Sequence, residues 1–181
     1  GNTWTLRGGI VHPGGILEPM VLEKKDGTLW ALVRLGSTQN NVDDGGVGQS
    51  FSTDRGKTWS PIEDHLPHPL IGVHSRLYFG RLNSGALIFV TNDSNRLRRN
   101  LTAFLSEDEG KTWPYSLMLD ARDGLGAIDG SKYMSGPSYP DLVQAPDGRI
   151  FLGWDFGRYN EKEMRLSIFT EEDIKAGSFV S

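Results

Sequence analysis

The sequence contains no cysteine, which excludes a disulfide framework, a thiolate nucleophile and a zinc site built on thiolates. No apolar run approaches the roughly 20 residues that a membrane-spanning helix needs. The net charge is −4 without any run rich in lysine or arginine, which argues against nucleic acid or an acidic membrane as partner. Three of the four histidines, His12, His65 and His68, lie in loops rich in proline and glycine and lack metal-ligand spacing. We therefore expect no metal and no cofactor.

The most informative pattern present is an eight-residue segment that occurs twice, as STDRGKTW at 52–59 and SEDEGKTW at 106–113. Six of the eight positions are identical, so the chain is built from repeats. The pattern predicts a tight turn between strands, in which the Asp side chain accepts backbone hydrogen bonds and the Gly adopts positive φ. Because these residues are used in building the turn, we interpret Asp54 and Asp108 as structural rather than catalytic.

Three hairpin turns interleave with this repeat, at Asp26-Gly27, Ser84-Gly85 and Asp147-Gly148, each flanked by alternating apolar residues. They divide the chain, taken as one domain over 1–181, into units at about 16–63, 75–119 and 137–170. The strands expected in these units are 18–23, 29–34, 48–53 and 58–62, then 76–82, 87–91, 100–106 and 112–119, then 139–144, 150–154 and 163–169. A capping box at 170–173 predicts one helical turn. Four strands per unit, repeated radially, are typical of a β-propeller.

The repeated segment resembles the Asp-box of sialidases and related β-propellers, S-x-D-x-G-x-T-W. Three further segments are similar to sialidase sequences, in the same order: Leu17–Glu23 with the following Arg34, Arg98–Thr102, and Ser138–Leu142. The resemblance implies an all-β, sialidase-type β-propeller, with about three four-stranded blades present of an expected six. Residues 3–7 could form the last strand of a preceding blade. Half a propeller would expose two sheet faces, so we expect a missing N-terminal half or a homo-oligomer.

The resemblance also implies a catalytic site on the propeller axis. Tyr139 would be the nucleophile, because a carboxylate nucleophile would be repelled by the carboxylate of a sialic acid. Glu18 would be the base that takes the proton of the tyrosine. Arg34 and Arg98 would bind that carboxylate through their planar guanidinium forks. Each assignment has an alternative: Glu18 could be solvated, Tyr139 could be a core aromatic, and Arg98 could lie in a solvated loop, with Arg99 as its rival.

Four more residues are candidates for substrate binding. His74 and Arg76 open the second inner strand and would face the axis. Asp155 and Arg158 follow Trp154 near the same mouth, where they could contact sugar hydroxyls or simply form an internal salt bridge.

The sequence departs from the family in three respects. Pro140 follows Tyr139 where characterised sialidases usually have Ser, and neither the R-I-P arginine nor the aspartate general acid/base has a counterpart. These 181 residues alone should therefore not hydrolyse a substrate. The resemblance implies a retaining exo-glycoside hydrolase for terminal sialic acid or a related acidic sugar, secreted or periplasmic, with a glycan as its partner. The other hypothesis is a non-catalytic Asp-box propeller that binds glycan or protein, because fold alone does not fix function.

Overall fold

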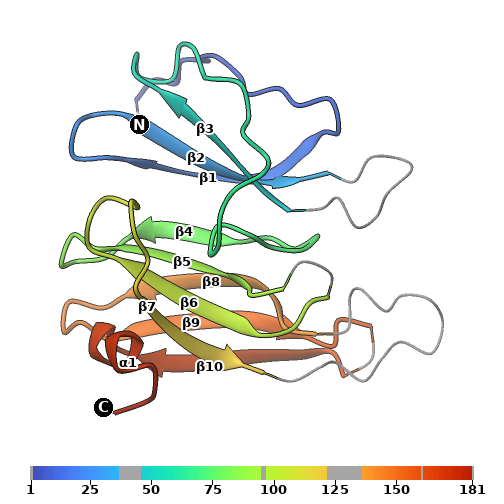
Figure 1. The fold of residues 1–181 in the computed structure, drawn as a ribbon, viewed down its shortest axis with the longest axis vertical. Helices are drawn as coiled ribbons and strands as arrows, with labels where there is room; N and C mark the ends of the chain where they lie inside the picture. The colour runs from blue at the N-terminus through green and yellow to red at the C-terminus, as the bar shows by residue number, and fades with distance from the viewer. Residues whose placement is uncertain (1, 37–45, 95–96, 122–135, 160, 181) are drawn as a thin grey trace.

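The computed structural model describes residues 2–36, 46–94, 97–121, 136–159 and 161–180, and in this part the chain forms three stacked antiparallel sheets (Figure 1). The first sheet has the order β1-β2-β3, the middle sheet β4-β5-β6-β7, and the third sheet β8-β9-β10. The elements are β1 (Ile16–Glu23), β2 (Leu29–Leu35), β3 (Val47–Ser52), β4 (Tyr78–Arg81), β5 (Leu87–Asn92), β6 (Leu101–Ser106), β7 (Tyr115–Asp120), β8 (Ser138–Gln144), β9 (Ile150–Phe156), β10 (Glu163–Phe169) and α1 (Glu171–Ala176).

All three predicted hairpins are confirmed, since β1 pairs with β2, β4 with β5 and β8 with β9. Their turn glycines have φ values of 85°, 93° and 91° at Gly27, Gly85 and Gly148, a backbone conformation that a residue with a Cβ rarely adopts. The helix α1 begins at the predicted capping box, in which Thr170 and Asp173 exchange side chain–backbone hydrogen bonds.

Both Asp-boxes are closed turns in which the aspartate is fully engaged. Asp54 Oδ1 accepts hydrogen bonds from the backbone N–H groups of Lys57 and Thr58 at 3.0 and 2.9 Å, and Oδ2 accepts the Thr58 hydroxyl at 2.6 Å. In the second box, Asp108 accepts from the backbone and hydroxyl of Thr112 at 2.9 and 2.6 Å. The geometry therefore supports a structural role for both aspartates.

Two expected strands are not formed. Residues 58–62 make no strand, and the only regular pairing near them is the isolated bridge between Gln49 and Glu63 among the described residues. Ser60 accounts for this, because its hydroxyl accepts the Phe51 N–H in place of a backbone carbonyl, and Pro61 has no N–H to donate. Residues 3–7 likewise contain no strand. In the described residues only the middle sheet has four strands, so the expectation of three four-stranded blades is corrected to one blade of four and two of three.

The core lies in the two spaces between the sheets. Between the first and middle sheets, Trp30, Leu32, Phe79 and Phe89 pack together, and the Trp30 and Phe79 rings meet edge to face at 4.9 Å. Between the middle and third sheets lie Ile88, Leu105, Leu152 and Phe169 with their neighbours. Every residue of β5 and β6 is buried, because the middle sheet is covered on both faces.

The two outer faces differ. Ala31 and Val33, on the face of the first sheet turned away from the core, are fully buried. Residues 8–15 run over this sheet, from a hydrogen bond between Gly8 N and the Gly56 carbonyl to one between Gly36 N and the Gly15 carbonyl (Figure 1). One of the two expected open faces is therefore partly covered, although Val21, which pairs with Ala31 on this face, is 51% exposed.

The outer face of the third sheet is open. It presents exposed apolar side chains along β10 and β8, namely Met164 (78% exposed), Leu166 (62%), Ile168 (49%) and Val143 (64%). In the described part of the chain no helix is both long and apolar enough to cross a membrane.

Candidate functional site

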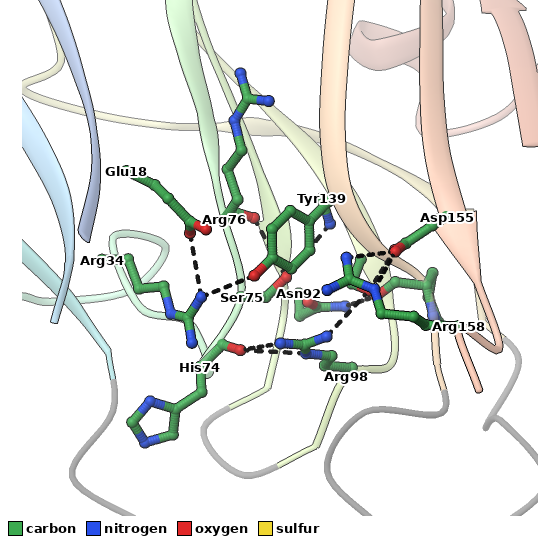
Figure 2. A network of polar contacts seen from close by, with 12 residues as sticks. Glu18, Arg34, His74, Ser75, Arg76, Asn92, Arg98, Tyr139, Asp155 and Arg158 are labelled. Atoms are coloured by element: carbon green, nitrogen blue, oxygen red, sulfur yellow. Dashed lines mark hydrogen bonds and ion pairs between the residues drawn. The ribbon is translucent and has the colours of Figure 1, made fainter. Parts of the chain in front are cut away.

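One residue lies at the same position of the repeat in, or just before, the first strand of each sheet. Glu18, Arg76 and Tyr139 each lie nine residues before the turn glycine of their hairpin, Gly27, Gly85 and Gly148 respectively. The strands that carry or follow them, β1, β4 and β8, contact one another in sequence order. The repeat therefore brings an acid, a cation and a phenol to neighbouring positions, as Figure 2 shows.

Glu18 and Tyr139 share an unusual backbone. Their φ values are 49° and 59°, in the left-handed region that residues with a side chain seldom enter. Both sit where the strand register shifts, between Leu17 and Met20 in β1 and between Ser138 and Asp141 in β8. Such bulges re-aim a side chain, and backbone strain of this kind costs about 1–3 kcal/mol per residue. The surrounding sheets hold both residues in this conformation, and here both side chains point toward Arg34 (Figure 2).

Arg34 connects the two residues. Its Nη1 donates to Glu18 Oε2 at 3.2 Å and to Tyr139 Oη at 3.0 Å. The side chain of Arg34 is only 12% exposed, and its Nε is buried without a hydrogen-bond partner. We expected Glu18 to contact the Tyr139 hydroxyl directly; the structure instead joins them through one guanidinium nitrogen. The prediction that Glu18, Arg34 and Tyr139 meet is otherwise supported by these distances.

Arg98 is turned inward. It is 3% exposed, and its Nε and Nη2 both donate to the backbone carbonyl of His74, while Nη1 donates to Ser138 Oγ at 3.4 Å. Burial lowers the pKa of Arg98 from its ordinary value, and the neighbouring cations Arg158 and Arg34 act in the same direction. The expected fork toward a substrate carboxylate is therefore occupied by the protein itself.

Asp155 and Arg158 form the internal salt bridge that was their alternative interpretation. Arg158 Nε donates to Asp155 Oδ2 at 2.7 Å, and Nη2 lies 2.5 Å from the same oxygen. Burial opposes the charged form, but Asp155 and Tyr139 raise the pKa of Arg158 above its ordinary value. The Arg158 Cζ lies 4.0 Å from the centroid of the Tyr139 ring, so this pair flanks the proposed nucleophile.

His74 and Arg76 reach the site less directly. His74 contributes its carbonyl to Arg98, and its imidazole points away from Tyr139 in Figure 2. Arg76 pairs with Asp141 at 3.3 Å, and its guanidinium points away from the Tyr139 hydroxyl (Figure 2). Neither side chain joins the group around Arg34.

Two site residues were not among the sequence candidates. Ser138 Oγ donates to Asp155 Oδ1 at 2.5 Å while it accepts from Arg98, and Ser75 Oγ lies 3.4 Å from the backbone N of Tyr139. Ser138 could have been found from register, because it pairs with Asp155 across β8 and β9.

The site carries an excess of positive charge. Three guanidiniums, Arg34, Arg98 and Arg158, surround Tyr139, against the two carboxylates of Glu18 and Asp155. Such a surplus favours an anionic group on a ligand. Among the residues that the structure describes, no three His, Asp or Glu side chains gather in a group that could hold a metal ion.

Comparison with known proteins places the chain in a family. The BNR repeat-like domain family model matches residues 1–152. The chain belongs to this family. No curated protein matches it by sequence. The NanB sialidase of Streptococcus pneumoniae is structurally similar, with 19% identity and a TM-score of 0.66, over 96% of this chain and 26% of that one.

An alpha-L-arabinofuranosidase of Fusarium graminearum is also similar, with 20% identity and a TM-score of 0.52 over 86% of this chain and 45% of that enzyme. This BNR repeat-like chain thus spans about a quarter of the length of the sialidase and under half of the length of the arabinofuranosidase. At such identities the likeness establishes the fold, and the three sheets are blades of a sialidase-type β-propeller.

Proposed function

We propose that the chain supplies part of the active site of a sialidase-like, retaining exo-glycoside hydrolase for terminal sialic acid or a related acidic sugar. The observation that carries the proposal is the bridging of Glu18 and Tyr139 by Arg34 Nη1, at 3.2 and 3.0 Å. A base, a phenol and a cation from two different blades meet there, which is the set of groups that this chemistry requires.

In the proposed first step, Tyr139 Oη attacks the anomeric carbon and its proton passes to Glu18. The bond from that carbon to the leaving-group oxygen breaks, and this oxygen takes a proton from an acid that we place outside this chain. Water then attacks the same carbon and passes its proton to the conjugate base of that acid, while the bond to Tyr139 Oη breaks and Oη regains its proton from Glu18, so that the configuration is retained. Both oxygens bond the same nitrogen of Arg34, so the proposed proton transfer requires Glu18 and the hydroxyl to approach each other from their positions on Nη1.

The charge around Tyr139 supports an acidic sugar. A neutral phenol is not repelled by the carboxylate of a sialic acid, and the excess positive charge attracts that carboxylate. Arg34 is the candidate for contacting it, since its guanidinium adjoins the Tyr139 hydroxyl. In the proposed site Arg98 does not take this part unless its bonds to His74 break.

The occupied Arg98 also favours a second candidate, a non-catalytic propeller that binds glycan. In that case Glu18, Arg34 and Tyr139 would recognise a sugar without transferring it. For either function we propose a secreted or periplasmic protein whose partner is a glycan, with further blades that complete the ring.

The decisive experiment treats the intact protein with a sialosyl fluoride that bears a second fluorine next to its anomeric carbon. Its fluoride leaves readily, and the second fluorine slows hydrolysis of the covalent intermediate. Mass spectrometry should find the sugar on the peptide containing Tyr139, and Tyr139→Phe should abolish both label and turnover. Glu18→Gln should slow labelling by about 10²–10⁴-fold, as expected for a lost general base. Undiminished turnover by Tyr139→Phe would refute the nucleophile, and glycan binding without labelling would indicate the binding module.

A further inference from the structure

We propose that Arg98 and Arg158 are positioning residues that clamp the ring of Tyr139, and that Ser138 and Asp155 lock the two arginines together. The inference rests on the proposed function in one respect, namely that Tyr139 is the reacting group. It assigns Arg98, Asp155 and Arg158 a different task from binding the sugar. We call these four residues, whose two arginines both contact the ring of Tyr139, the tyrosine clamp.

The first arm of the clamp is Arg158. Its Cζ lies 4.0 Å from the centroid of the Tyr139 ring, within the range of a strong cation–π contact. Two of its nitrogens, Nε and Nη2, meet one carboxylate oxygen, Asp155 Oδ2. Asp155 is only 16% exposed, and its other oxygen, Oδ1, accepts a hydrogen bond from Ser138. If Arg158 turned to a sugar, the Asp155 carboxylate would lose its ion-pair partner.

The second arm is Arg98, whose Cζ lies 5.3 Å from the same ring centroid. All three of its side-chain nitrogens are bonded, two to the carbonyl of His74 and one to Ser138 Oγ. The chain before β8 also presses on this residue, since a Cβ at Gly136 would lie 1.4 Å from the Arg98 carbonyl oxygen. Movement of Arg98 toward a substrate would leave buried groups unpaired, at a cost of about 1–3 kcal/mol for each.

Ser138 closes the clamp. Its hydroxyl accepts from Arg98 Nη1 and donates to Asp155 Oδ1 at 2.5 Å, so that one chain of bonds runs Arg98–Ser138–Asp155–Arg158. Both ends of this chain contact the ring of the residue next to Ser138. Figure 2 shows Asp155 and Arg158 on the side of Tyr139 away from Glu18 and Arg34, with Arg98 below the ring.

Tyr139 needs such support because its backbone does not provide it. The residue sits at a bulge with φ of 59°, and its hydroxyl accepts from Arg34 at the tip of a long side chain. A displacement of about 1 Å between a nucleophile and its target can cost 10²-fold in rate. By fixing the plane of the ring, the clamp would keep Oη beside Glu18 while Arg34 changes partners on substrate binding.

The ring can be observed directly in the full chain labelled with 3-fluorotyrosine. The sequence has five tyrosines, and the ¹⁹F resonance of Tyr139 is identified by its loss in Tyr139→Phe. Arg158→Ala should shift and sharpen this resonance, and Asp155→Asn should move it in the same direction. Arg158→Lys should restore it only in part, because an ammonium keeps the charge but cannot make the two-nitrogen contact with Asp155.

Arg149→Ala is the matched control. Arg149 also pairs with an aspartate, Asp147 at 2.7 Å, and lies 5.4 Å from the ring of Phe151, but it is remote from Tyr139 in the hairpin turn. This variant should leave the Tyr139 resonance in place. Because Arg98→Ala removes a buried cation and could unfold the chain, the test depends on Arg158 and Asp155. An unmoved resonance in Arg158→Ala would overturn the clamp.

Kinetics on the intact protein separate positioning from binding. Arg158→Ala should lower kcat by about tenfold or more while KM changes by less than about twofold, since a positioning residue acts in the reaction step. A rise in KM at unchanged kcat would instead show that Arg158 binds the sugar and would overturn the inference. If Tyr139→Phe retained full turnover while Arg158→Ala still shifted the Tyr139 resonance of the otherwise unmodified chain, the proposed function would fail and the contact of the clamp with the ring would stand.

Discussion

Gly110 of the second Asp-box packs directly against the indole ring of Trp30 in the neighbouring blade. A Cβ added to Gly110 would stand 2.3 Å from Trp30 Cζ3 and 2.6 Å from Cη2. A Cβ atom does not approach non-bonded atoms so closely. The turn of one blade and the core aromatic of the next therefore hold each other in position. The Asp-box of the middle sheet thus joins two blades as well as closing its own turn.

This contact predicts a difference between two otherwise equivalent glycines. Gly56 and Gly110 have φ values of 78° and 82°, so alanine at either position carries a left-handed backbone cost of about 1–2 kcal/mol. At Gly56 the new Cβ would meet Leu29 at an ordinary 3.6 Å. At Gly110 it would clash with Trp30, which should add about 1–3 kcal/mol. Urea unfolding of Gly56→Ala and Gly110→Ala measures the difference, and equal losses would contradict the contact.

A second prediction concerns the acid stability of the same turn. Glu109 accepts from Arg81 Nη1 and Nη2 at 2.6 and 3.0 Å and from the backbone N of Lys25 at 3.0 Å. The bonds from Arg81, together with Lys25, lower the pKa of Glu109 from 4.5 to about 2. Since the folded pKa is depressed, the stabilisation is complete above about pH 4.5 and is lost as the pH falls toward 2.

Glu109→Gln should therefore destabilise the chain at neutral pH, by about 1.5–3 kcal/mol. It should also flatten the fall in unfolding free energy between about pH 4.5 and pH 2. Glu107→Gln serves as control, because Glu107 is half exposed and its pair with Lys175 is worth less. Denaturant midpoints across that pH range give the comparison. A slope for Glu109→Gln equal to that of the unmodified chain would count against this account.

Asp108→Ala should act on folding and leave catalysis unchanged. The substitution removes the acceptors for Thr112 and Ser106, at a cost of about 1–2 kcal/mol by analogy with a lost helix cap. Melting temperature and turnover are measured side by side on the intact protein. A large loss of turnover at an unchanged melting temperature would refute the structural role of the box.

The open face of the third sheet predicts self-association of the 181-residue chain. Met164, Leu166 and Ile168 form an exposed apolar row along β10, and such a face tends to recruit other sheets. Light scattering should show a mass that rises with concentration. Leu166→Lys should reduce the association, whereas Glu172→Lys on α1 should not. A monomer at high concentration without any substitution would contradict this prediction.

Local patterns in the sequence were enough for much of the fold. The hairpins at Gly27, Gly85 and Gly148 and the two Asp-boxes were predictable because each turn is built from adjacent residues. The missing strand at 58–62 was not, because it depends on whether the Ser60 hydroxyl or a backbone carbonyl accepts from Phe51. Both choices are compatible with the same pattern of apolar residues.

The candidate site was predictable in its members but not in its bonds. Glu18, Arg34 and Tyr139 were named from motifs and do converge. That Arg34 stands between the other two, and that Arg98 turns inward to His74, follows from the packing of separate blades. Sequence spacing along one strand carries no information on contacts of this kind.

The equivalence of Glu18, Arg76 and Tyr139 has a consequence for how such a protein can change. Each occupies the same position of its repeat, where the side chain lies outside the apolar layers between the sheets. Residues at these positions can therefore be exchanged with little effect on the packing between blades. In a ring of such blades, a new active site can arise by substitution at these equivalent positions while the packed cores stay unchanged.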